Sequence, residues 1–93
     1  MQKLYDAIAR LGRQYGADQI LLFGSRARGD YKERSDIDLA VYGMPEENRP
    51  GFWMELEELP TLLKFDVVHI GSGADPALMK NIEIDGVILY EKM

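Results

Sequence analysis

The chain has 93 residues, of which 46% are hydrophobic and 29% charged, and its formal net charge is −5. This composition predicts one folded domain over residues 1–93, and the absence of cysteine excludes a disulfide framework and a thiolate nucleophile. The negative charge argues against broad binding to nucleic acid or anionic membranes, and without a membrane-spanning or signal segment a cytoplasmic location is expected.

The N-terminal segment has the pattern of an amphipathic helix. Its apolar side chains recur in steps of four, three and four residues from Leu4 to Tyr15, which places them on one helical face. The helix is expected to end near Gly16. Residues 19–23 then form a short apolar run that stops at Gly24, which is typical of a buried strand.

A basic, glycine-punctuated segment follows this strand. It predicts a short helix over residues 25–29 and then a loop. Four of the eleven positive charges of the chain lie in this segment: Arg26, Arg28, Lys32 and Arg34. A small anion could therefore bind here despite the negative net charge. Residues 36–42 begin with alternating polar and apolar side chains, and this period of two predicts a second strand.

The middle of the chain predicts a loop, a helix and a strand. Residues 43–51 contain two prolines and two glycines and are expected to form an exposed connection. A helix is expected from Phe52 to a break near Pro60. Residues 65–70 predict a third strand, terminated by the two glycines that flank Ser72.

The C-terminal segment admits two interpretations. Asp75-Pro76 is a good helix start, and the helix would end at Asp85-Gly86 before a strand over residues 87–90. The alternative makes Asp85-Gly86 the turn of a hairpin between residues 82–84 and 87–89. With the helix, the alternation of helices and strands predicts an α/β or α+β sheet with helices packed against it.

Two carboxylates lie two residues apart on the second predicted strand. Asp36 and Asp38 therefore leave the same face, about 6.6 Å apart at Cα, while Ile37 and Leu39 point into the core. Like charges at this separation repel, and Mg²⁺ is the cation that suits such oxygen ligands together with substrate phosphates. The alternative is an Asp pair on an edge strand that faces water and prevents aggregation.

A third carboxylate, Asp66, lies among apolar residues on the next predicted strand. If that strand pairs with the one bearing Asp36 and Asp38, a strand spacing of about 4.8 Å brings the three together, in a geometry suited to two metal ions. The alternative is a strand-end cap or an ion pair with a lysine. His69 falls on the opposite face from Asp66 and is expected to pack there.

Gly24-Ser25 ends the first predicted strand. This pair offers a close backbone approach, a hydroxyl and several N–H groups, which together can hold a terminal phosphate. Ten residues separate it from the Asp-x-Asp pattern that begins at Asp36. The combination is more informative than either part.

These motifs resemble a known family. Residues 23–29, Phe-Gly-Ser-Arg-Ala-Arg-Gly, followed by residues 35–39, Ser-Asp-Ile-Asp-Leu, are similar to the signature of polymerase-β-type minimal nucleotidyltransferase (MNT) domains, including the MntA-type antitoxins. The resemblance covers nearly the whole chain and includes the third carboxylate in residues 65–68. It implies a polymerase-β-like nucleotidyltransferase fold, with a mixed sheet of about four strands and helices packed mainly on one face.

The resemblance also implies roles for the three carboxylates. Asp36 and Asp38 would ligate two Mg²⁺ ions, one of which bridges the triphosphate of ATP. Asp66 would complete the other metal site and help to deprotonate or orient the acceptor hydroxyl.

The same resemblance assigns residues to the nucleotide. Gly24 and Ser25 would hold the β- and γ-phosphates, and Arg26 or Arg28 would neutralise charge on the leaving pyrophosphate. In such transfers positioning and electrostatics supply most of the catalysis.

The function implied is Mg²⁺-dependent transfer of AMP from ATP to a hydroxyl, expected to be a tyrosine, of a helical HEPN-type toxin. The chain would then be a type VII-like antitoxin that binds neither nucleic acid nor membrane, in a homodimer or hetero-oligomer. One alternative is a non-catalytic antitoxin that neutralises a helical partner through an exposed patch such as Phe52 or Trp53. A third interpretation, a fragment of a drug nucleotidyltransferase, lacks residues to hold the drug.

Overall fold

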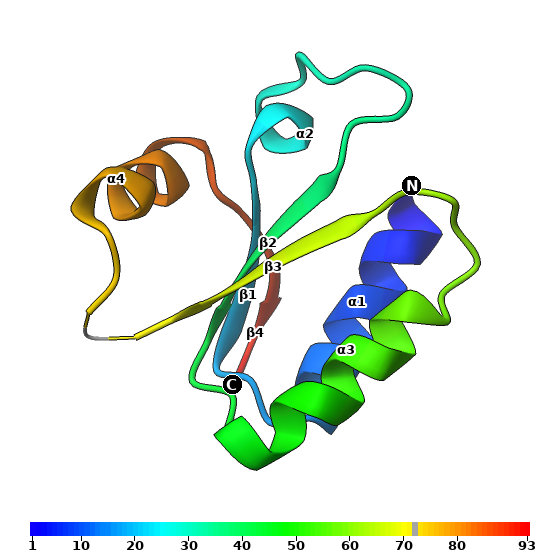
Figure 1. Cartoon of the computed structure of the whole chain (residues 1–93), viewed down its shortest axis with the longest axis vertical. Helices are drawn as coiled ribbons and strands as arrows, with labels where there is room; N and C mark the ends of the chain where they lie inside the picture. The colour runs from blue at the N-terminus through cyan, green and yellow to red at the C-terminus, as the bar shows by residue number, and fades with distance from the viewer. Residues whose placement is uncertain (72) are drawn as a thin grey trace.

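A computed structural model describes residues 1–71 and 73–93 (Figure 1). None of the helices in these residues has the length and apolar character needed to cross a membrane. The elements are, in chain order, α1 (Gln2–Gln14), β1 (Gln19–Phe23), α2 (Ser25–Arg28), β2 (Ile37–Tyr42), the 3₁₀ helix η1 (Glu46–Asn48), α3 (Arg49–Glu57), β3 (Phe65–Ile70), α4 (Pro76–Asp85) and β4 (Val87–Glu91).

The four strands form one mixed sheet in the order β3-β2-β1-β4. β1 runs antiparallel to both β2 and β4, whereas β2 and β3 are parallel. A parallel pair needs a crossover connection, and α3 supplies it between β2 and β3. The predicted α+β class with a mixed sheet of four strands is therefore confirmed.

The helices cover the sheet unequally. α1 and α3 lie together on one face and α4 lies on the other (Figure 1). The larger core lies beneath α1 and α3 and contains Ile8, Leu11, Ala17, Ile20, Leu22, Ile37, Leu39, Val41, Met44, Phe52 and Leu56. A smaller cluster of Phe23, Ala40 and Ile82 joins α4 to the opposite face. The face beneath α1 and α3 thus carries most of the buried apolar surface.

One expectation for the middle of the chain was wrong, and one residue of an alternative interpretation is buried. Residues 43–51 were expected to form an exposed connection, but residues 46–51 are helical, because Pro50 falls in the first turn of α3, where its missing N–H would have no partner within the helix. The non-catalytic alternative placed Phe52 or Trp53 on an exposed patch; Phe52 is fully buried against the sheet, while its neighbour Trp53 is 41% exposed.

The C-terminal segment forms the helix and not the hairpin. Asp75 caps α4 by accepting a 3.1 Å hydrogen bond from the backbone N–H of Ala77, and Pro76 occupies the first turn. The predicted strand end at residues 71–73 agrees with β3 ending at Ile70, although Ser72 itself lies outside the described residues.

Candidate active site

Two of the three predicted carboxylates lie on adjacent strands, and the third comes immediately before one of these strands. Asp38 is the direct partner of Asp66 on β3 and of Phe23 at the end of β1. Asp36 lies one residue before β2 begins. The strand pairing that the sequence left open therefore exists, and it places Asp66 beside Asp38 at the normal spacing of strands, about 4.8 Å.

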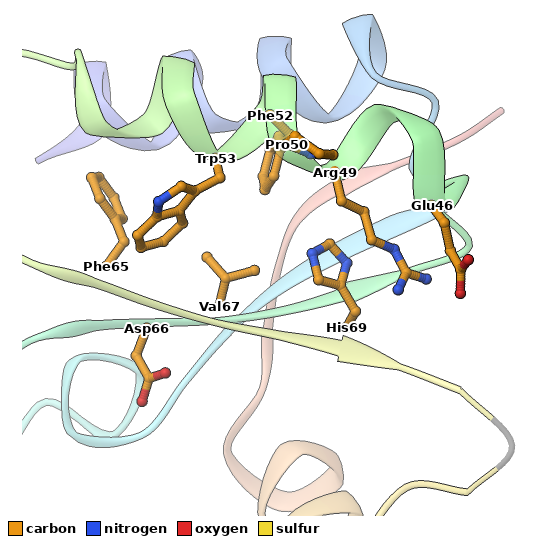
Figure 2. Close-up of a pocket in the computed structure, with 9 residues that line it drawn as sticks. All are labelled: Glu46, Arg49, Pro50, Phe52, Trp53, Phe65, Asp66, Val67 and His69. Carbon is orange, nitrogen blue, oxygen red and sulfur yellow. The ribbon is translucent and has the colours of Figure 1, made fainter.

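The carboxylates of Asp38 and Asp66 leave the sheet face opposite α1 and α3. Ile37 and Leu39, which alternate with Asp38, are fully buried beneath those helices. Figure 2 shows Asp66 pointing away from α3, on the other side of β3 from Val67 and His69. Asp38 is half-buried and Asp66 exposed, so the site opens to solvent on the β3 side.

Gly24 brings the Gly-Ser turn against Asp38. Its φ is +75°, a backbone conformation that side chains other than glycine rarely adopt. A Cβ at this position would overlap the Asp38 carboxylate. The Gly24 carbonyl accepts from the N–H groups of Ala27 at 3.2 Å and Arg28 at 3.1 Å, which starts α2. The turn and the carboxylates thus form one continuous surface.

The electrostatics of this surface favour a bound cation. Burial raises the pKa of Asp38, the charges of Asp66 and Asp36 raise it further, and the nearby Arg28 opposes them. Within residues 1–71 and 73–93, no three acidic or histidine side chains already form a compact metal site. The donors are nevertheless carboxylate oxygens, which fit Mg²⁺ because it retains waters and takes further ligands from substrate phosphates.

The two arginines of the motif have different surroundings. Arg28 is exposed, and its guanidinium lies 3.3 Å from Asp30 and 3.3 Å from Asp85 at the end of α4. Arg26 is buried, and it donates 3.1 Å hydrogen bonds to backbone carbonyls of the following loop. Sequence reasoning treated the two alike because nothing in their order along the chain distinguishes their burial. It also missed Asp85, which it used only as a helix stop.

A separate cavity of about 480 Å³ lies between α3 and β3 (Figure 2). Trp53, Phe65 and His69 line it on the helix side of the sheet. Burial lowers the pKa of His69, as does Arg49, and the buried Nδ1 of His69 has no hydrogen-bond partner within the described residues. His69 thus packs on the face predicted for it, away from the carboxylates.

Comparison with known proteins gives one consistent result. The family model described as Polymerase beta, Nucleotidyltransferase matches residues 7–93. The candidate protein adenylyltransferase MJ1379 of Methanocaldococcus jannaschii is 40% identical over 77 residues, which cover 77% of this chain and 76% of that protein.

Solved structures share the fold. A chain in a toxin–antitoxin structure with AMP-PNP matches with a TM-score of 0.75 and 24% identity, over 96% of this chain and 74% of that one. A chain in the complex of a tri-AMPylated Shewanella oneidensis HEPN toxin with an MNT antitoxin matches with a TM-score of 0.69 and 24% identity, over 99% and 74% respectively.

Proposed function

Because the chain belongs to the polymerase-β nucleotidyltransferase family, we propose that residues 1–93 form a minimal nucleotidyltransferase domain that transfers AMP from ATP to a partner protein. The observation that carries the proposal is the register of Asp38 with Asp66, directly beside the Gly24 turn. This arrangement places a pair of carboxylates beside a backbone turn of the kind that can hold a phosphate.

The carboxylates hold the reacting groups. Asp36 and Asp38 would hold two Mg²⁺ ions, and Asp66 would help to hold one of them. When bound, the ions supply Lewis-acid polarisation of the α-phosphate and balance the charge of the leaving group. Because Asp66 is exposed, a macromolecular hydroxyl can reach it, and its carboxylate orients that hydroxyl and accepts its proton.

The Gly-Ser turn and Arg28 hold the remainder of the nucleotide. The backbone at Gly24 and the Ser25 hydroxyl bind the β- and γ-phosphates, which fixes the α-phosphate in line with the acceptor. The acceptor oxygen forms a bond to the α-phosphorus as the bond to the β-phosphate oxygen breaks, and pyrophosphate leaves. Arg28 is exposed and can exchange its carboxylate partners for this pyrophosphate.

The proposed acceptor is a tyrosine hydroxyl of a helical HEPN-type toxin, and the chain is the antitoxin that inactivates it. Support comes from the shared fold with a chain in the complex of an AMPylated HEPN toxin with an MNT antitoxin, and from the adenylyltransferase named among the relatives. The shared fold with a chain solved with AMP-PNP supports ATP as the donor. Since the reaction consumes ATP, we place it in the cytoplasm.

The direct test is label transfer from [α-³²P]ATP, with Mg²⁺, to the proposed partner, a HEPN-type toxin. We expect the wild-type protein to label the partner, and we expect Asp38→Asn to lower the rate of labelling at least about a thousandfold. Asp6→Asn, on the exposed face of α1, is the matched control and should retain full activity. An unlabelled partner, or equal labelling by Asp38→Asn, would refute the proposal.

One observation favours a second candidate, neutralisation by contact alone. Trp53 and Met54 are consecutive residues of α3, and both of these large apolar side chains are exposed. Under this candidate, Asp38→Asn would still suppress the toxicity of the partner in cells, whereas Trp53→Ser would not. Under the catalytic proposal, Asp38→Asn abolishes protection.

A further inference from the structure

Arg26 is buried in a way that phosphate binding does not explain. Its side chain is 8% exposed, and it is the one buried charged residue in the part of the chain that the structure describes. Burying a guanidinium is costly unless its N–H groups find acceptors. Within residues 1–71 and 73–93, the ion pairs closer than 4.0 Å belong to Arg28, so Arg26 is compensated by other means.

Its acceptors are two backbone carbonyls of one turn. The Nε of Arg26 donates to the carbonyl of Ser35, and its Nη2 donates to that of Glu33, both at 3.1 Å. The turn is closed by Lys32 and Ser35, because the N–H of Lys32 donates to Ser35 Oγ at 2.8 Å and the N–H of Ser35 donates to the Lys32 carbonyl at 3.0 Å. One planar guanidinium therefore clamps both sides of a closed turn.

Two tyrosines enclose the same guanidinium. The Arg26 Cζ lies 4.5 Å from the ring centroid of Tyr31, within the range of a cation–π contact. Tyr5 of α1 is close enough that Arg26 opposes the rise in its pKa, which burial causes. Arg26 thus connects α2, the loop after it and α1.

The clamped turn leads directly into the carboxylates. Asp36 follows Ser35, and the register of β2 with β3 begins only at Ile37, so the sheet does not hold Asp36 itself. We propose that Arg26 is a positioning residue, which fixes Asp36 relative to Asp38 by holding the turn of residues 32–35. The proposal rests on the nucleotidyl transfer proposed above and replaces phosphate contact as the role of Arg26.

Lysine cannot perform this role, because an ammonium group lacks the planar fork that reaches two carbonyls at once. Arg26→Lys and Arg26→Met should therefore behave alike. The control is Arg13→Met, which removes an exposed arginine from the last turn of α1.

The first measurement is amide hydrogen exchange of the metal-free protein, which requires no activity. We expect exchange across residues 31–37 to be at least about tenfold faster in both Arg26 variants, with the central amides of β1 and β2 unchanged. Unchanged exchange in residues 31–37 would overturn the proposal. If Arg26→Met does not fold, Arg26→Lys and Tyr31→Leu provide the same comparison.

The second measurement separates positioning from phosphate binding. We expect kcat to fall at least about tenfold and the half-saturating Mg²⁺ concentration to rise, with KM for ATP changed by less than about threefold. A raised KM with normal kcat would instead identify a phosphate contact and overturn the proposal. If wild type transfers no AMP, the proposed function fails, while the exchange result still decides whether Arg26 holds the turn.

Discussion

At the scale of residues, Gly24 and Asp38 lie so close together that position 24 has no room for a side chain. The turn at Gly24 has a positive φ, and the Asp38 carboxylate fills the space where a side chain would begin. Glycine is needed here for two separate reasons, backbone conformation and close approach. Gly29 needs glycine only for its backbone conformation, because its φ is +88° but nothing lies within 4 Å of the point that a Cβ would occupy.

The pair of glycines makes a matched test. Gly29→Ala should lower the free energy of unfolding by about 1 kcal/mol, because alanine at positive φ is strained, and Gly24→Ala should lower it further, because its Cβ would also overlap Asp38. Only Gly24→Ala also displaces Asp38, so it should lose about a hundredfold in kcat/KM while Gly29→Ala keeps normal activity. Urea unfolding and steady-state kinetics on both variants check this, and equal activities would contradict the assigned contact.

His69 predicts a pH dependence of stability. Burial and the charge of Arg49 lower its pKa below the ordinary value of 6.5, and Glu46 also lines the cavity, whereas the Asp66 carboxylate points to the other side of β3 (Figure 2). The unfolded chain therefore binds a proton more readily than the folded one, so stability is full above pH 6.5 and declines as pH falls toward the lower folded pKa.

The chain contains one histidine, so the measurement is direct. NMR titration of the imidazole should give a pKa below 6.5, and the urea concentration at the unfolding midpoint should decrease as the pH is lowered below 6.5. In His69→Gln that decline should be smaller. An imidazole that titrates above 6.5 would contradict the assigned burial.

At the scale of elements, α4 has one fully buried side chain, Ile82, with the partly buried Leu78 packed against the same cluster. Ile82 is 2% exposed against Phe23 and Ala40, whereas Ile84, two residues later on the same helix, is 69% exposed. In a hairpin these two residues would share a face, but on a helix they point in different directions.

Substitution of the two isoleucines tests the helix directly. Ile82→Ala should lower the free energy of unfolding by about 2–4 kcal/mol, and Ile84→Ala by less than about 0.5 kcal/mol. Chemical denaturation of both variants is the measurement. Equal losses would favour the hairpin interpretation.

Local sequence patterns predicted most of the helices and strands, and the features that they missed have physical explanations. The strands over residues 19–23 and 65–70 were predicted with the observed bounds, because apolar β-formers end there at glycine. The start of α3 was missed, because Pro50 favours a loop and a first helical turn equally. The sequence does not say which sheet face a helix covers, since that depends on the crossover.

At the scale of the whole molecule, the candidate site depends on topology. Alternation along one strand predicts that Asp36 and Asp38 share a face, but β2 begins only at Ile37, so for Asp36 this stays a prediction. Asp66 lies beside Asp38 because β3 pairs with β2 in parallel through α3, which only the fold determines. The burial of Arg26 is equally hard to predict from the sequence, because it results from the loop folding back over α2.

The most direct measurement is calorimetric titration of Mg²⁺ into the protein saturated with AMP-PNP. We expect wild type to take up about two Mg²⁺ ions, with the affinity reduced at least about tenfold in Asp38→Asn and Asp66→Asn, each checked for folding by circular dichroism. Wild type that takes up no Mg²⁺, or an Asp66→Asn variant that binds it as wild type does, would contradict a shared site built from these strands.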